Sequence, residues 1–434
     1  MQNLSKNNIN ILHKWYKLFQ KRQKILPSKE AKYNWEQIKS LGIPMRKQEN
    51  WKYISLNEFF NNHFIDAIYC NISKKECNSL SLKLHAYKLV FINGKYSSLL
   101  SDKKLGYWKI KTKNQENHQL TKKLIIPDIF AYLIESLRKE MITIFLPKEK
   151  KENIPLYLLH INQGSTKENT LATINYRHHI ELNNGSTGKI IEHFVSKNNF
   201  QAYFNNTRTS IILNNSAKLK YIKLGFENHN SYHFGYNDIY TKKNSIFSSN
   251  TIMVGSKINR NQTNVKINGK NSNIIINSLL IPCTKNTIGD SKTYIEHNKS
   301  NCISRQLHKI IVHKYGKGIF DGIIKVKRCA YKTDSKMINH NLLLDKLAEI
   351  NTKPQLNIYT DDVVCNHAAT IGSIDSNQIL YLRSRGISYQ DAKKMIIFSF
   401  FADFLESIDC KILKKIIFLR IYEIFQNNKN IKLL

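Results

Sequence analysis

The pattern of apolar and polar positions changes twice along the 434 residues of the chain. Up to about Glu58, apolar side chains recur at helical spacing, at Ile11, Leu12, Trp15, Leu18 and Phe19. From residue 87 strand-like stretches begin, the first at 88–92 before an Asn-Gly turn, and a further helix is expected at 129–141. We therefore expect residues 1–155 to form an N-terminal helical and mixed region.

Short β-rich runs occupy the middle of the chain, separated by Asn, Gly, Ser and Lys. Clear examples lie at 189–195, 209–213, 219–224, 273–280 and 322–326. Short strands separated by turn residues over roughly two hundred positions suit a sandwich, a barrel or a solenoid, and no strict sequence repeat decides among these three folds. Asn tolerates left-handed turns and can form hydrogen-bonded ladders between stacked coils, which favours a solenoid core over residues 156–375.

Helical periodicity returns after residue 375, so residues 376–434 are expected to form a C-terminal helical region. Ser388, with Asp391 three positions on, is typical of a helix start, and a second helix is expected at 411–425. One face of the first helix is apolar, at Ile396, Ile397, Phe400, Phe401, Phe404, Leu405 and Ile408. This face either packs on the chain's own core or docks a partner, and the pattern favours neither.

The chain is strongly basic, with 67 Lys and Arg against 32 Asp and Glu. The excess would normally indicate nucleic acid or an anionic surface, but it is spread from end to end without a basic stripe or a binding motif, so we expect no nucleic-acid partner. The apolar runs are far shorter than the ~20 residues of a membrane-spanning helix, and residues 1–20 lack the apolar core of a secretory signal. A cytoplasmic location without membrane attachment is expected.

Most short motifs carry no chemistry. The seven cysteines are widely dispersed and include no CxxC, which argues against a disulfide framework or a self-contained zinc or cluster site. The stretch 185–190 resembles a P-loop but has two residues between its glycines instead of four, so it predicts a turn. The histidines, including His178, His179 and His193, are scattered, and each is interpreted as structural or solvated.

The densest candidate chemistry lies at 359–370. If this segment is a strand, Cys365 and His367 stand two positions apart and project from the same face. A thiolate and an imidazole suit iron or zinc, but two ligands alone do not bind an ion tightly. We interpret Cys365 and His367 as half of a metal site that another chain has to complete.

Several ordered blocks around this pair resemble the SufB/SufD family, at 320–326, 332–334, 341–344, 352–359, 365–370 and 381–387. The segment 42–44 followed by 49–53 is similar to the SufD branch, as is Asn366 between the Cys and the His, where SufB-type chains carry an acidic residue. The resemblance implies a mainly β fold, with a right-handed parallel β-helix core and helical regions at both ends.

The resemblance also implies a function. It implies a non-catalytic scaffold subunit for iron–sulfur cluster assembly that pairs with SufB through the β-helix core and docks the ATPase SufC through its C-terminal helices. Cys365 and His367 would then lie at the SufB–SufD interface, where a transient cluster is built. A homodimer in isolation is a further expectation, and reduced flavin is associated with the family although no dinucleotide fingerprint is visible here.

The alternative reading is a β-solenoid that binds or processes carbohydrate. Such a protein needs clustered carboxylates or an aromatic track along its coils. Acidic residues are sparse in this chain, which places the alternative second.

Overall fold

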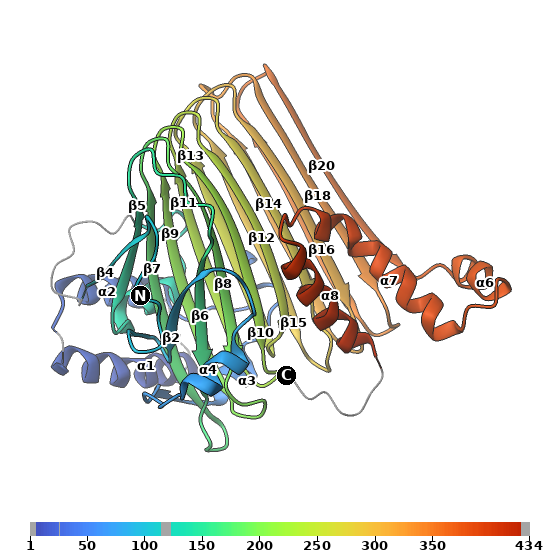
Figure 1. The fold of residues 1–434 in the computed structure, drawn as a ribbon. Helices are drawn as coiled ribbons and strands as arrows, with labels where there is room; N and C mark the ends of the chain where they lie inside the picture. The colour runs from blue at the N-terminus through green and yellow to red at the C-terminus, as the bar shows by residue number, and fades with distance from the viewer. Residues whose placement is uncertain (1–5, 26, 114–122, 427–434) are drawn as a thin grey trace.

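Two long sheets face each other along the body of the molecule (Figure 1). The computed structural model describes residues 6–25, 27–113 and 123–426. Residues 1–5 of the stretch in which no secretory signal is expected, and residues 427–434 of the expected C-terminal helical region, lie outside the described residues. The first sheet contains, in order, β4 (Lys109–Lys113), β5 (Met141–Leu146), β7 (Thr170–Leu182), β9 (Tyr203–Leu213), β11 (Tyr232–Thr241), β13 (Ile258–Ile267), β15 (Ile288–His297), β17 (Lys317–Val326) and β19 (Glu349–Ile358), with β1 (His63–Asp66) paired to β7.

The second sheet has the complementary set of strands. In order it contains β3 (Lys95–Ser97), β2 (Tyr87–Ile92), β6 (Leu156–Asn162), β8 (Thr187–Ser196), β10 (Lys218–Glu227), β12 (Ile246–Gly255), β14 (Asn273–Ile281), β16 (Ile303–Val312), β18 (Thr333–Leu343) and β20 (Val363–Ser373). From β5 onward, consecutive strands alternate between the sheets and neighbouring strands within a sheet are parallel. About seven turns of a parallel β-solenoid result, which confirms the expected mainly β fold and excludes a sandwich or a barrel.

Asparagine shapes the turns as the sequence predicts. Asn244 and Asn271 have φ of 57° each, in the left-handed region that Asn tolerates better than most residues. The side chain of Asn271 donates to Asn244 Oδ1 at 3.2 Å, and that of Asn298 donates to Asn268 Oδ1 at 3.1 Å. These bonds join successive coils. The P-loop-like stretch 185–190 begins in the turn between β7 and β8, with Gly185 at φ 68°, but its residues 187–190 belong to strand β8, so the predicted turn covers only the start of the stretch.

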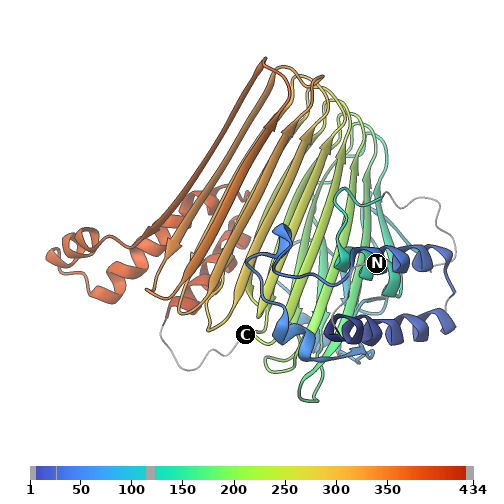
Figure 2. The same cartoon turned by 180° about the vertical axis from the view of Figure 1, so that it is seen from behind.

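Helices near the N-terminus cover the outer face of the first sheet (Figure 2). They are α1 (Lys6–Ile25), α2 (Lys29–Leu41), a 3₁₀ turn (Glu49–Trp51), α3 (Asn57–Asn61) and α5 (Ile129–Leu137), while α4 (Lys74–Leu80) packs near β2 and β6 of the second sheet. Trp15 of α1 is fully buried, with its ring 5.9 Å from Phe60, 5.8 Å from Phe64 and 5.6 Å from Phe130. Aromatic contacts therefore join the helices to one another and to the sheet.

The C-terminal helices α7 (Tyr389–Glu406) and α8 (Lys411–Phe425) lie on the outer face of the second sheet (Figure 1). Ser388 caps α7, because its hydroxyl accepts the Asp391 N–H at 3.1 Å, as expected. Ile397, Phe401 and Phe404 are buried against the sheet, so the apolar face of α7 packs on the chain's own core. The short helix α6 (Ser376–Ser384) and the start of α7 project beyond the solenoid.

Strands from the first 155 residues, β1 to β5, already belong to the two sheets. The division into regions at residues 156 and 376 remains a prediction about domain organisation. None of the helices in the described part of the chain is long and apolar enough to cross a membrane.

Candidate functional site

The last coil of the solenoid ends in two open strand edges. β19 and β20 stand at the ends of their sheets, so each pairs with one neighbour, β17 and β18 respectively. The opposite edge of each strand presents backbone N–H and C=O groups that pair with no other described strand, and such edges accept a strand from another chain. In Figure 1, β20 forms the rim of the second sheet.

Cys365 and His367 both lie on β20, so the expected strand geometry is confirmed. Their register partners on β18 are Ser335 and Met337, which are fully buried on the inner face of that strand. Since side chains alternate with period two, Cys365 and His367 share this inward-facing side. Cys365 is half-buried against the core cluster that contains Met337, whereas His367 is exposed.

The surroundings of Cys365 keep its sulfur protonated. Burial raises the pKa of the Cys365 thiol, and the nearby carboxylate of Asp334 raises it further. A thiol with a raised pKa becomes a metal ligand only when a cation displaces its proton. Among the described residues, Cys365 and His367 belong to no group of three or more potential ligands that converge on one point. Cys365 and His367 share one face of β20, and their role as half of a metal site remains a prediction.

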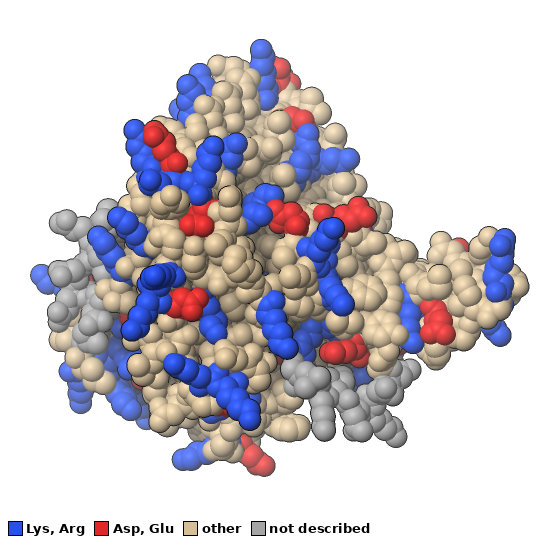
Figure 3. Space-filling view, viewed as in Figure 1, with Lys and Arg blue, Asp and Glu red and all other residues tan. Residues whose placement is uncertain are grey.

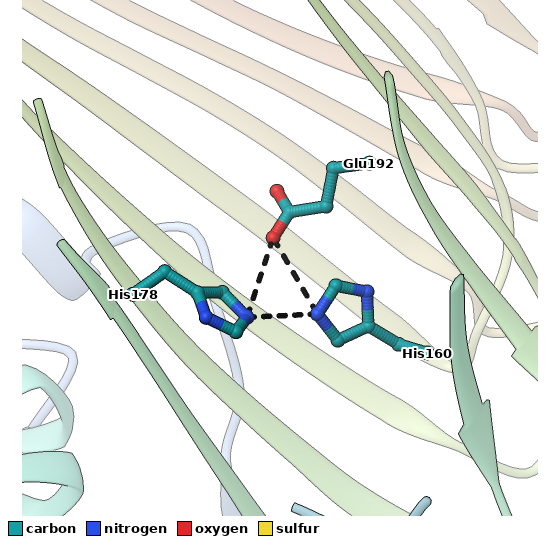
Figure 4. Close-up of side chains that lie close together, drawn as sticks. All are labelled: His160, His178 and Glu192. Atoms are coloured by element: carbon teal, nitrogen blue, oxygen red, sulfur yellow. Dashed lines mark hydrogen bonds and ion pairs between the residues drawn. The ribbon is translucent and has the colours of Figure 1, made fainter. Parts of the chain in front are cut away.

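A second group of potential ligands lies inside the solenoid, where His160 of β6, His178 of β7 and Glu192 of β8 converge (Figure 4). The Nε2 atoms of the two histidines are 2.8 Å apart, which makes a hydrogen bond between them. Glu192 Oε1 lies 3.8 Å from His160 Nε2 and 4.0 Å from His178 Nε2. All three side chains are at most 1% exposed.

Burial determines the charge of this group. It lowers the pKa of His160 well below its ordinary value, and it lowers the pKa of His178 to about 3, with Arg177 contributing. Both rings are therefore neutral, so one carries its proton on Nε2 and donates to the other. Burial raises the pKa of Glu192, although the Tyr221 hydroxyl donates to its carboxylate.

Sequence reasoning missed this group, because it treated His178 alone as structural and considered neither His160 nor Glu192. A signal was present in the strand pattern. His160 occurs in the otherwise mostly apolar run Leu156–Asn162, and Glu192 follows the apolar pair Ile190 and Ile191 within the strand Thr187–Ser196. An ionisable residue within a buried apolar strand is unusual and marks a position worth inspection.

The charges on the molecular surface indicate less about function than the two groups of potential ligands do. In Figure 3 the basic side chains are dispersed over the visible face and interleaved with acidic ones, so that this face carries no continuous basic track. The absence of a nucleic-acid partner remains a prediction.

The fold defines the class of protein: a parallel β-solenoid whose last coil ends in open strand edges, which are surfaces of the kind that pair with another chain.

The comparisons identify the family. Residues 162–400 match the family model described as "SUF system FeS cluster assembly, SufBD core domain". The chain is 41% identical to the iron–sulfur cluster assembly protein SufD of Escherichia coli over 415 residues, which covers 96% of this chain and 97% of that protein. It is 27% identical to an iron–sulfur cluster assembly SufBD family protein of Synechocystis, over 85% of this chain and 84% of the relative.

The chain therefore belongs to the SufB/SufD family, and its resemblance to SufD extends over nearly its whole length. Its role lies in iron–sulfur cluster assembly, as a non-catalytic assembly subunit.

Proposed function

We propose that this chain is the SufD-type half of a composite cluster-assembly site, which a SufB chain completes at the open rim formed by β19 and β20. The observation that carries the proposal is the position of Cys365 and His367 on the last strand of the solenoid, beside an edge that no described strand covers. Iron and sulfide are the cargo of this site rather than resident cofactors.

The rim suits a partner that is itself a strand-rich solenoid. A second solenoid could pair its own terminal strands with β19 and β20 and bury the exposed side chains there, among them Val364 and Ile371. Ligands from that partner would raise the coordination number beyond the two that this chain supplies. Binding of iron would displace the Cys365 proton and convert the thiol to a thiolate. The same open edges support a homodimer when the partner is absent.

We propose that the SufC ATPase binds the C-terminal arm, which consists of α6 and the start of α7 and projects beyond the solenoid. Leu380 and Tyr381 of α6 and Tyr389 and Met395 of α7 are exposed, by 64%, 58%, 51% and 49% respectively. The buried face of α7 holds the arm on the second sheet, so these apolar side chains remain available to a partner. ATP hydrolysis belongs to SufC in this scheme. A cytoplasmic location and an association with reduced flavin remain predictions from the family resemblance.

The half-site is tested by His367→Ala in a complex co-expressed with SufB and SufC and purified without oxygen. We expect the three chains to co-purify in unchanged ratio and the visible absorption of the cluster to fall strongly, since one ligand is lost. The matched control is His340→Ala on the neighbouring strand β18. The ring of His340 shares a hydrogen bond of 2.8 Å with the hydroxyl of Thr370. Unchanged cluster absorption in His367→Ala, or an equal loss in both variants, contradicts the assignment.

The docking surface is tested by Leu380→Ser combined with Tyr381→Ser. Deleting α7 and α8 would uncover the apolar outer face of the second sheet, so substitutions on α6 are cleaner. We expect capture of SufC to fail while capture of SufB persists. Tyr315→Ser, at a turn residue that is 52% exposed, serves as control. Retention of SufC by the α6 double variant would remove α6 from the interface.

The carbohydrate alternative is not favoured, because the family match and the SufD relatives support cluster assembly.

A further inference from the structure

The interior of the first coils contains a group of ligands that the rim site does not use. His160, His178 and Glu192 come from three consecutive strands, and their side chains meet between the two sheets (Figure 4). The three donor atoms lie within 4.8 Å of one another. Glu192 Oε1 is fully buried and has no hydrogen-bond partner within the described residues, although a buried carboxylate oxygen normally has one. An unpaired acceptor that faces two imidazole nitrogens needs an explanation.

The ring of His160 is held in a fixed orientation. It stacks between the rings of Phe91 and Phe194, at centroid distances of 4.8 Å and 4.3 Å and interplanar angles of 12° and 21°. Tyr176 contacts it edge-on at 4.6 Å. The packing directs His160 Nε2 toward the other two ligands before any ion binds, and such preorganisation lowers the entropic cost of binding.

The carboxylate is positioned as well. The hydroxyl of Tyr221, which is fully buried on β10, donates to Glu192 Oε2 and leaves Oε1 directed at the histidines. Hydrogen bonds from such outer residues orient a metal ligand and raise its affinity for the ion. The group thus has three potential ligands and one supporting donor.

We propose that His160, His178 and Glu192 bind one divalent first-row transition-metal ion, Zn²⁺ or Fe²⁺, inside the solenoid. Two imidazoles and one carboxylate are a donor set used for both ions. Ligands of a tetrahedral ion with bonds of about 2.0–2.2 Å stand about 3.4 Å apart. The separations of 2.8, 3.8 and 4.0 Å lie on both sides of that value, so shifts below about 1 Å bring all three into place. When the ion binds, the proton on Nε2 of one histidine moves to Nδ1 of the same ring, so that both neutral imidazoles coordinate through Nε2.

Such an ion joins the two walls of the solenoid. His178 belongs to β7 in the first sheet, whereas His160 and Glu192 belong to β6 and β8 in the second. A metal bound only in the folded state stabilises that state in proportion to its affinity. The site therefore cross-links the first coils at the end of the solenoid opposite the rim of β19 and β20, and it is independent of the function proposed for that rim.

One residue opposes the ion. Lys223 is fully buried in register with Glu192 on the neighbouring strand β10, and its Nζ makes no hydrogen bond within the described part of the chain. Its ammonium group would repel a cation and partly neutralise Glu192. Removing that charge with Lys223→Met is expected to tighten metal binding, which a purely structural ion pair between Lys223 and Glu192 does not predict.

The test uses the full-length chain, stripped with a chelator during unfolding and refolded without oxygen in the presence of Co²⁺, Zn²⁺ or Fe²⁺. We expect one bound equivalent by elemental analysis, a Co²⁺ absorption spectrum typical of nitrogen and oxygen ligands, and a higher melting temperature. His178→Gln and Glu192→Gln should lose that equivalent and the spectrum. Tyr221→Phe should weaken binding about 10–100-fold, as expected for a supporting residue. Separate Zn²⁺ and Fe²⁺ titrations show which ion is preferred.

Two controls keep the result interpretable. His308→Gln changes another fully buried histidine that lies outside the group, and Cys365→Ser with His367→Ala removes the rim pair. Both should retain the bound equivalent. The proposal is overturned if His178→Gln and Glu192→Gln, with a normal β-rich circular dichroism spectrum, still bind one ion, or if the unaltered chain binds none. Loss of the ion only in the rim double variant would place it at the rim instead.

Discussion

Replacing Glu135 by Gln tests what holds the N-terminal helices on the solenoid. Glu135 of α5 is 2% exposed, and its carboxylate accepts from Arg177 Nε at 2.6 Å and lies 3.2 Å from Arg138 Nε. It also pairs with Arg208 of β9. Burial raises the pKa of Glu135, but the three guanidinium groups outweigh burial and hold that pKa well below its ordinary value. Gln preserves the shape of the side chain and removes its charge.

The expected cost follows from burial. Breaking a buried ion pair by neutralising one partner costs about 3–5 kcal/mol, because the remaining charges are left uncompensated. Glu36→Gln on α2 is the matched control, since it makes the same change in a surface pair with Lys39 in which the Glu36 side chain is 63% exposed. Surface pairs contribute about 0–1 kcal/mol. Denaturant unfolding followed by tryptophan fluorescence measures both, because Trp15 and Trp35 lie among these helices.

The pH dependence provides a second check. The folded-state pKa of Glu135 is depressed, so its contribution to stability is complete above the unfolded pKa of about 4.3 and is lost as the pH falls below it. The deficit of Glu135→Gln should therefore be constant between about pH 6 and pH 8 and should shrink in acid. A deficit no larger than that of Glu36→Gln at neutral pH would refute the reasoning.

Two further predictions concern the coils of the solenoid and the packing of the C-terminal helices α7 and α8. Gly255 has φ 87°, and a Cβ there would lie 1.9 Å from a backbone carbonyl oxygen of the neighbouring coil, so Gly255→Ala should lower the free energy of unfolding by at least about 1–3 kcal/mol. At Gly372 an added Cβ would meet no described non-neighbouring atom within 4 Å, so Gly372→Ala should change the free energy of unfolding by less than about 0.5 kcal/mol. Phe401→Ala removes a fully buried side chain of α7 and should lower the local free energy of unfolding by about 3–5 kcal/mol. The loss should be seen as faster hydrogen exchange in α7 and α8. Leu419→Ala, at a position 46% exposed, should leave exchange unchanged.

The rim pair illustrates what local pattern predicts well. A strand has a side-chain period of two, so the spacing of Cys365 and His367 alone implies a shared face, and β20 bears this out. The helix start at Ser388 and the asparagine turns are equally local features, and the structure contains them. Whether the pair binds iron depends on groups from another chain, and this remains a prediction.

The apolar face of α7 is a feature whose packing partner the local sequence pattern does not predict. The same stripe of apolar residues serves a helix that packs on its own sheet and one that docks a partner. The structure places Ile397, Phe401 and Phe404 on the second sheet and leaves Leu380 and Tyr381 of α6 exposed. The pattern predicted a helix, but only the path of the chain decided which surface the helix covers.

The amino-acid sequence alone determined the succession of a helical, a β-rich and a second helical region and the shared strand face of Cys365 and His367, because these depend on periodicity and on residues close together in the chain. The pattern favoured a solenoid but did not exclude a sandwich or a barrel, and the parallel β-helix was implied by the resemblance to the SufB/SufD family. Only the tertiary structure brought His160, His178 and Glu192 together. Contacts across the interior depend on the length of each turn, the register of neighbouring coils and the spacing of the two sheets. None of these three quantities is encoded in the spacing of the residues themselves.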